Sequence, residues 1–137
     1  MLNKLYPKTA HKFHKLKIMR EGVCIGWVVM LCTKMENNKY FGNLNLGSII
    51  DAFSNPEHSE LIISKSVEYL RGLKADLIVV NHANTEWGKR FARNGFVKGP
   101  SNFIFASSKG LKDYFEQDVD FNNSFLMRGD GDGPVHL

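Results

Sequence analysis

Residues 76–96 read DLIVVNHANTEWGKRFARNGF, and this stretch decides the fold. The run Asp76–Val80 is short and almost continuously apolar, which is typical of a central strand covered on both faces. Asn84 stands where a helix N-cap is expected, and the helix then covers Thr85–Asn94. Gly95 occupies the place at which a left-handed residue usually ends a helix. The stretch therefore predicts a strand followed directly by a helix.

The residues before this stretch predict a crossover connection. Ser54–Glu57 is a typical helix opening, with a capping side chain, a proline in the first turn and an acid beside the positive helix end. The helix predicted over 56–73 has its apolar residues at three- and four-residue steps. We therefore expect strand 76–80 to lie parallel to an earlier strand that ends near Asp51, with the helix crossing between them.

Further strands are predicted on both sides of this unit. Upstream, strands at 15–19 and 23–32 form a hairpin, a turn follows at 36–39, and a strand at 40–53 has a bulge near Gly47. Downstream, the patterns predict strands at 102–107 and 121–128, with a short helical excursion at 111–115 between them. The order β-β-β-α-β-α-β-β predicts an α+β, three-layer domain. We expect one domain over 1–137, with a basic arm at 1–13 and a flexible tail at 129–137.

Apolar periodicity also predicts which side chains are buried. The expected core residues are Ile62, Val67, Leu70, Leu77, Val79, Phe91 and Phe96. Cys24 and Cys32 lie eight residues apart on one predicted strand, about 26 Å from each other at about 3.3 Å per residue. They are therefore too far apart for a disulfide and are expected to be small core residues in a reducing compartment.

Composition and charge restrict the class of protein. The chain has 137 residues, of which 43% are hydrophobic and 23% charged, as in a globular domain. The longest apolar run, Val23–Cys32, spans about ten residues, whereas a membrane helix needs about 20. No secretory signal is found either, so we expect a cytoplasmic protein. Residues 1–20 contain six Lys and Arg residues and no acid, which is a surface able to meet phosphates.

The segment Asn84–Phe96 resembles the helix signature N-x-x-A-x-x-x-Y-x-K-x-G-F of the GNAT N-acyltransferase superfamily. The order of predicted elements over about residues 14–128 is also similar to that family. The resemblance implies that acyl-CoA binds where two parallel strands splay apart, and that its acyl group passes to a small amine acceptor. The family's N-terminal β1-α1-α2 elements are missing. The acceptor groove is therefore incomplete, or the chain is the C-terminal part of a larger protein.

The resemblance also implies site residues, and two of its motifs are altered here. In the pyrophosphate loop [QR]-x-x-G-x-[GA], Ser59 takes the place of the Arg or Gln, and Ile62 and Ser64 replace the glycines. Phe91 replaces the tyrosine that protonates the departing thiolate, so this proton must come from solvent or another residue. Loss of the glycine loop predicts weak cofactor binding, because one or two charge-assisted hydrogen bonds are lost.

The remaining implied contacts lie at the ends of the two parallel strands. Asp51 is the first candidate for the base that deprotonates the amine, and His82, just past the second strand, is the alternative. Backbone N–H groups between Gly47 and Ala52 are expected to hold the thioester carbonyl. The predicted cofactor-binding residues are Ile50, Asp51, Ala52, Ser59, Ser64, Asn84 and Phe91.

Other functions stay open at this point. The altered loop and Phe91 fit a catalytically inactive GNAT-fold module that serves binding or assembly. A nucleic-acid adaptor rests on the basic N-terminus alone, and no RNP signature accompanies the strand aromatics. His11 and His14 have no further ligands nearby, so no metal site is predicted. A homodimer is among the alternatives.

Overall fold

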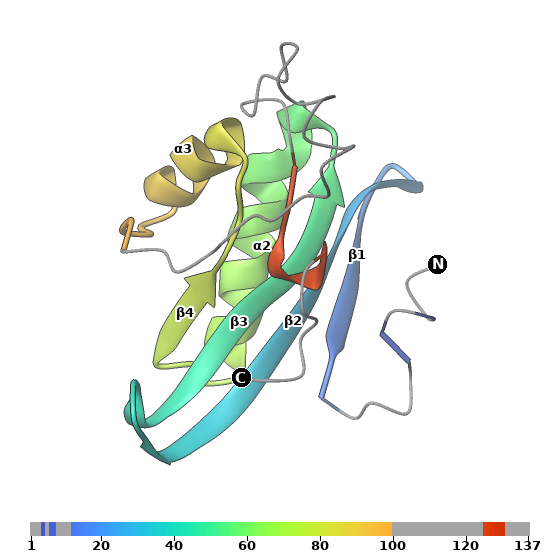
Figure 1. Ribbon diagram of the computed structural model, residues 1–137. Coiled ribbons are helices and arrows are strands. Elements are labelled where there is room, and N and C mark those ends of the chain that lie inside the picture. Colours follow the sequence, from blue (N-terminus) through green and yellow to red (C-terminus); the bar gives the residue numbers. More distant parts are fainter. Residues whose placement is uncertain (1–3, 5, 8–11, 100–124, 131–137) are drawn as a thin grey trace, which may run out of the picture.

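A computed structural model describes residues 4, 6, 7, 12–99 and 125–130 of the chain (Figure 1). Its sheet has the strand order β1-β2-β3-β4, with β1 (His14–Arg20), β2 (Val23–Asn38), β3 (Gly42–Ser54) and β4 (Leu77–Val80). Two helices follow β3 and β4, namely α2 (Ser59–Gly72) and α3 (Thr85–Arg93). Short 3-10 helices, η1 (Pro56–His58) and η2 (Arg128–Asp130), complete the described elements. The predicted elements at 102–107 and 111–115 lie outside the described residues. Of the strand predicted at 121–128, the described part contains only an isolated bridge at Met127 and then the start of η2, so no strand is formed there.

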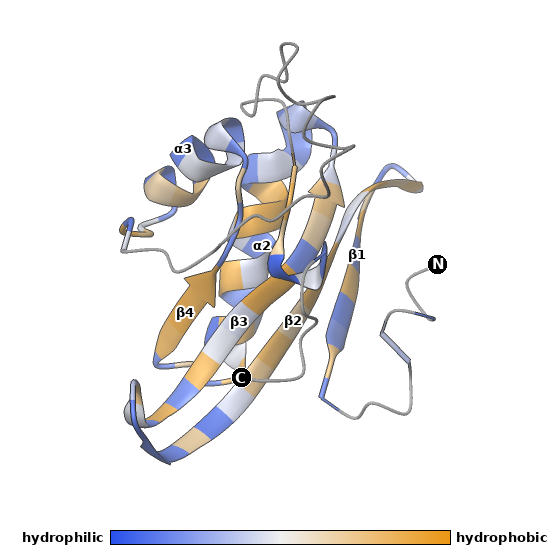
Figure 2. Ribbon diagram, in the orientation of Figure 1, coloured by the Kyte–Doolittle hydropathy of each residue, from blue (hydrophilic) through white to orange (hydrophobic). Residues whose placement is uncertain are grey.

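Antiparallel hairpins join the first three strands. The first turn contains Glu21 at φ 50° and Gly22 at φ 79°, a left-handed pair that matches the twist of the strands. The second strand runs on to Asn38, six residues beyond its predicted end at Cys32. The turn predicted at 36–39 therefore begins later than expected. Beyond Cys32, polar and apolar residues alternate over 34–36 of β2 and over 43–46 of β3, as the hydropathy colours of Figure 2 show, and this pattern suits the longer pairing.

The long strand β3 is bulged, but not at Gly47. Val29 pairs with Asp51 and Met30 with Ile49, so Ile50 is the extra residue. The prediction of a bulged strand is confirmed and its position was wrong by three residues. Gly47 has another role, since a Cβ there would lie 3.1 Å from Ala75 and 3.2 Å from Leu70. Its missing side chain lets the helix connection pack closely on the strand.

The predicted crossover unit is confirmed. Strands β3 and β4 pair in parallel, from Leu46 opposite Leu77 to Ile49 opposite Val80, and α2 connects them. The helix buries Ile62, Ile63 and Leu70 against the sheet. Burial of such side chains, at roughly 1.5–3 kcal/mol each, stabilises the helix against the strands that it joins.

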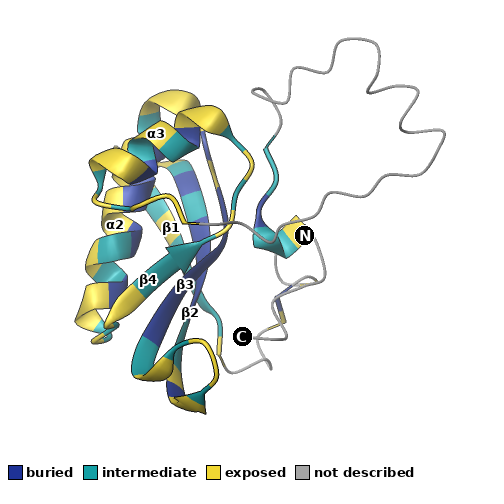
Figure 3. Cartoon of the chain, turned by 60° about the vertical axis from the view of Figure 1, so that its left-hand side comes forward, coloured by how far each residue is buried: buried dark blue, intermediate teal, exposed yellow. Residues whose placement is uncertain are grey.

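Both described helices lie on one face of the sheet (Figure 3). The main core cluster lies between this face and the helices and includes Val28, Met30, Ile62, Trp87 and Phe91. The opposite face carries a smaller cluster of Tyr6, Val29, Leu31 and Ile50. Within the described residues, helices α2 and α3 cover one side of the sheet, and the third layer that was predicted stays a prediction.

The burial predictions are partly confirmed. Ile62, Leu70 and Phe91 are buried, whereas Val67, Val79 and Phe96 are half-buried. Leu77 is 40% exposed, which contradicts the prediction. The reason is that β4 is an edge strand of the described sheet, so its apolar run is not covered on both faces. Cys24 is exposed and Cys32 half-buried, so Cys24 is not the core residue that was expected.

Candidate functional site

The candidate site lies where β3 and β4 stop pairing. The two strands are hydrogen-bonded in parallel as far as Ile49 and Val80. The bulge at Ile50 follows at once, and β3 continues to Ser54 after β4 has ended. Residues 50–54 of β3 and residues 81–84 after β4 therefore form two diverging edges, here called the splayed end. The carboxyl ends of parallel strands are where open sheets bind ligands.

Asp51, the first candidate base, is a buried carboxylate at the splayed end. Its Oδ2 accepts a hydrogen bond of 3.1 Å from the hydroxyl of Tyr6, which is itself 1% exposed. Burial raises the pKa of Asp51, and the nearby charge of Asp130 adds to this rise. The hydrogen bonds from Tyr6 and from the backbone of Ala52 act in the opposite direction. A carboxylate with a raised pKa is a stronger base than an ordinary aspartate.

The Tyr6 contact was not foreseen from the sequence. Tyr6 belongs to the basic N-terminal arm, where no periodic pattern precedes or follows it. Its ring packs edge-to-face on Phe13 at 5.2 Å, and its carbonyl accepts a hydrogen bond from the Lys15 ammonium. Burial and the Asp51 charge raise the pKa of Tyr6, so its phenol stays protonated and donates to Asp51.

His82, the alternative base, lies on the helix side of the splayed end. Its ring stacks on Phe91 with centroids 5.0 Å apart, and it packs closely against Gly88 of α3. Burial lowers the pKa of His82, and the backbone of Asn84 offsets part of this effect. The imidazole is therefore neutral at neutral pH and able to accept a proton. Its Nδ1 atom is buried and makes no well-formed hydrogen bond with the described residues.

The structure brings both candidate bases to the splayed end, but on different sides of it. Asp51 accepts a hydrogen bond from Tyr6, which belongs to the cluster on the sheet face opposite the helices. His82 stacks on Phe91, which belongs to the helix-side core. The chain segment Phe125–Asp130 lies between them, since Met127 forms an antiparallel bridge with His82 and Gly129 lies against Asp51.

The predicted phosphate-binding residues do not share one surface. Ser59 is buried and its Oγ donates to the carbonyl oxygen of Pro56 at 2.6 Å. Ile62 is fully buried and packs closely against Gly26, while Ser64 is exposed on the outer side of α2. The helix start also carries the acids Glu57 and Glu60, which oppose the binding of an anion. The cofactor roles of Ser59 and Ser64 stay predictions.

The signature helix α3 is built as its sequence indicates. The Oδ1 of Asn84 accepts a hydrogen bond of 3.0 Å from the backbone N–H of Trp87, which confirms the N-cap. Gly95 ends the helix with φ at 87°. Phe91 is 2% exposed, with Phe96 packed edge-to-face on it at 4.9 Å. Asn84 and Phe91 thus have structural roles, and their proposed contacts with a cofactor stay predictions.

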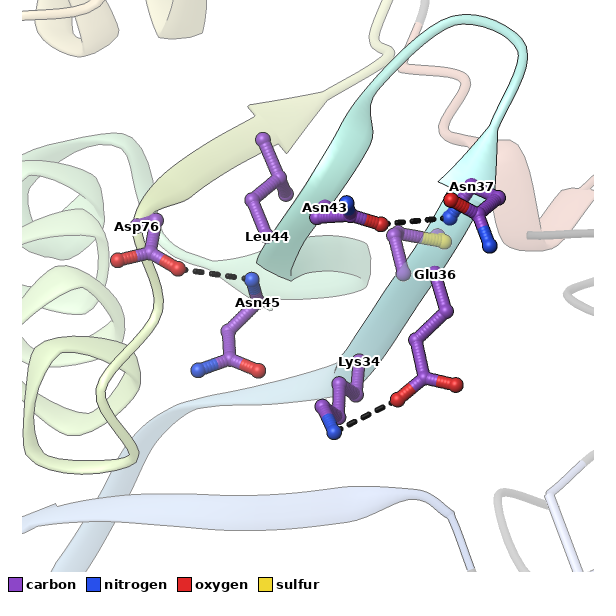
Figure 4. Close-up of a pocket in the computed structure, with 8 residues that line it drawn as sticks. Lys34, Glu36, Asn37, Asn43, Leu44, Asn45 and Asp76 are labelled. Atoms are coloured by element: carbon purple, nitrogen blue, oxygen red, sulfur yellow. Dashed lines mark hydrogen bonds and ion pairs between the residues drawn. The ribbon is translucent and has the colours of Figure 1, made fainter.

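A polar groove of about 460 Å³ lies at the opposite end of β3 (Figure 4). Its polar groups are engaged with one another. The carboxylate of Asp76 accepts from the backbone N–H of Asn45 at 2.8 Å, and the Lys34 ammonium pairs with Glu36 at 2.6 Å. The residues that line it are Lys34, Met35, Glu36, Asn37, Asn43, Leu44, Asn45 and Asp76. The groove has no part in the splayed end.

Two further findings concern the described residues alone. Within them, no three His, Cys, Asp or Glu side chains are placed to hold a metal ion together. None of the helices that they form is long and apolar enough to cross a membrane.

Comparison with known proteins supports the fold. No family model matches the sequence, and no curated protein is similar to it in sequence. The chain is similar in structure to aminoglycoside N-acetyltransferase AAC(6′)-Iy in complex with CoA, with a TM-score of 0.51 at 10% identity. The match covers 72% of this chain and 77% of that one. Likeness at this identity establishes the fold alone. The chain therefore has an α+β, GNAT-like fold, as the resemblance of residues 84–96 implied.

Proposed function

We propose that the chain is an N-acyltransferase that transfers an acyl group from acyl-CoA to a small amine. One observation carries the proposal, namely that the parallel pair of β3 and β4 diverges at a bulge directly beside a buried carboxylate. The structural neighbour with this fold is an N-acetyltransferase that was crystallised with CoA. Burial of an ionisable group without a structural need for it is typical of a functional site.

The proposed reaction is direct attack of the amine on the thioester. The carboxylate of Asp51 takes a proton from the amine nitrogen, a C–N bond forms at the acyl carbon, and the C–S bond breaks. The thiolate leaves and takes a proton from solvent or another group, because Phe91 has none to give. A bulge leaves its extra residue outside the ladder, so the N–H of Ile50 is our candidate donor to the thioester carbonyl.

Tyr6 has a positioning role in this proposal. Its hydroxyl donates to Oδ2 of Asp51 and so holds one carboxylate oxygen in place. An ionised carboxylate has about four lone-pair sites, so one remains to accept the amine proton beside the bonds from Tyr6 and Ala52. The cross-strand aromatic pair of Trp27 and Phe53, with centroids 6.4 Å apart, lies next along the same strands. Phe53 is 56% exposed and offers an apolar surface for the body of the acceptor.

The test has a binding step and a transfer step. Acetyl-CoA at 100 times its dissociation constant should raise the free energy of unfolding by about 2.7 kcal/mol, measured as a thermal shift. Weak binding is expected, because Ile62 and Ser64 stand where glycines form the phosphate loop. A panel of amines is then assayed for release of free CoA thiol. A chain that shows no shift at millimolar acetyl-CoA would instead be a binding or assembly module.

Two matched variants assign the base. Asp51→Asn keeps an acceptor for the Tyr6 hydroxyl and should lower kcat about 10²–10⁴-fold with unchanged acetyl-CoA affinity. His82→Gln should change kcat much less. The reverse outcome, with transfer lost in His82→Gln and kept in Asp51→Asn, would assign the base to His82.

A further inference from the structure

The segment Phe125–Asp130, here called the C-terminal strap, occupies the splayed end. On one side the N–H of Ala83 donates to the carbonyl of Leu126 at 2.9 Å, and His82 forms an antiparallel bridge with Met127. On the other side Gly129 lies against Asp51, and η2 contacts β3. Figure 1 shows the strap, in red, between β3 and the residues that follow β4. The strap therefore fills the space between the two diverging edges.

The strap is seated through its side chains as well. Met127 is fully buried and belongs to the helix-side core, together with Ala52, Trp87 and Phe91. Phe125 packs edge-to-face on Trp87, with centroids 5.0 Å apart. The strap also closes on itself, because the Met127 N–H donates to Oδ2 of Asp130 at 2.9 Å. A ligand that enters the splayed end must therefore displace an ordered segment, and cannot simply fill an open cleft.

The space around Gly129 in the strap is too small for a side chain. A Cβ on Gly129 would overlap the Tyr6 hydroxyl and would lie 3.1 Å from the Cβ of Asp51. Only glycine fits at this position while the strap is seated over the Tyr6–Asp51 pair. The strap thus covers the same carboxylate that the proposed reaction uses.

We propose that the C-terminal strap is an autoinhibitory plug, which leaves the splayed end before acyl-CoA binds there. The inference rests on the proposed function, because it assigns the cofactor to the space that the strap fills. The strap and the acyl group compete for the edge of β3 at Ile50–Ala52. The apparent dissociation constant for acyl-CoA then equals the intrinsic one divided by the fraction of molecules with the strap released.

The contacts of the strap make release feasible. Its backbone is joined to the chain after β4 by the hydrogen bond from Ala83 to Leu126 and by the isolated bridge between His82 and Met127, and not by a long ladder. Its most buried side chain is that of Met127. Methionine is unbranched and flexible, so it can leave and re-enter an apolar site more easily than a branched or aromatic side chain. Release uncovers Asp51 and frees the N–H of Ala83 at the same time.

The experiment compares Gly129→Ala with Gly99→Ala, because a Cβ on Gly99 would have no atom within 4 Å. Hydrogen exchange of the Ala83 amide reports the seated strap without any ligand, and calorimetry gives the dissociation constant for acetyl-CoA. Gly129→Ala should lower the protection of the Ala83 amide and strengthen acetyl-CoA binding about tenfold or more. Gly99→Ala should match the natural chain in both measurements. Adding Tyr6→Phe to Gly129→Ala removes the overlapping hydroxyl and should restore part of the protection.

The possible outcomes separate the two proposals. Acetyl-CoA that binds the natural chain should also remove protection from the Ala83 amide. If it binds while this amide stays protected, the plug is wrong and the proposed function stands. If Gly129→Ala releases the strap and affinity does not change, the plug is wrong as well. If neither the natural chain nor Gly129→Ala binds acetyl-CoA, the proposed function is wrong, and the plug proposal, which depends on it, is wrong as well.

Discussion

The two ends of β3 differ in how far their ionisable side chains are exposed to solvent. At the hairpin end, the charged side chains of Lys34 and Glu36 are exposed and pair with each other. At the splayed end, Asp51 is buried and His82 is half-buried, and neither forms an ion pair with a described residue. Exposed charges have little effect on stability, whereas buried ones are costly to maintain. The contrast supports our proposal that the site lies at the splayed end.

The largest effect should come from comparing one fully buried side chain at each end. Leu46→Ala, in the paired part of β3, should lower the free energy of unfolding by about 2–5 kcal/mol. Met127→Ala removes an equally buried side chain from the strap but should cost less. The strap can detach from an otherwise intact fold, which limits the loss. Urea denaturation of both variants measures this difference, and equal costs would show that the strap is a fixed part of the core.

A smaller effect is expected at the start of α3. Asn84→Ala removes the cap on the Trp87 N–H and should lower the free energy of unfolding by about 1 kcal/mol. Asn84→Asp keeps an acceptor oxygen and should stay close to the natural chain. If Asn84→Ala instead has no effect on stability but weakens acetyl-CoA binding, the cofactor contact predicted for Asn84 would be favoured over its capping role.

The smallest effect is the pH dependence of stability, and its sign differs between the two candidate bases. The pKa of Asp51 is raised from about 3.8, so the folded chain binds more protons than the unfolded one above that value. Its contribution to the free energy of unfolding therefore falls as the pH rises through this window. The pKa of His82 is lowered from about 6.5, so its contribution falls as the pH drops below that value.

Denaturant unfolding between about pH 4 and pH 8 tests this pair. The free energy of unfolding of the natural chain minus that of Asp51→Asn should fall as the pH rises. The same difference for His82→Gln should rise with pH. A difference curve for Asp51 that rises with pH would mean that its hydrogen bonds outweigh its burial. The comparison of the two ends would then lose its basis, since Asp51 would be an ordinary stabilised carboxylate.

The crossover unit was predictable from the sequence because its signals are local. The apolar steps of 56–73, the cap at Asn84 and the glycine at 95 depend on residues within one or two helical turns. The same holds for the first hairpin, whose turn needs the left-handed pair Glu21 and Gly22. These local signals predicted the parallel pair of β3 and β4. The splay at its end was implied by the GNAT resemblance alone.

The position of the bulge and the exposure of Leu77 were not predictable in this way. Gly47 has the composition of a bulge residue, but the approach of Leu70 and Ala75 explains it, and the extra residue is Ile50. Ile50 is an ordinary apolar strand residue, so its residue type does not mark the position of the bulge. Leu77 belongs to an apolar run whose burial depends on which strands lie beside it. The residues of the run do not indicate the strand order.

The sequence by itself predicted the crossover and the cap of α3. Both follow from residue type and short-range spacing, which a single chain displays directly. The capping side chain predicted at 54–57 makes no cap hydrogen bond, and the two candidate bases came from the GNAT resemblance. Only the tertiary structure decided that Asp51 meets Tyr6, 45 residues away, and that Met127 and Gly129 fill the splayed end. These contacts join segments with no shared periodicity. Their pairing results from the shape of the space between two diverging strands, which exists only after the sheet has formed.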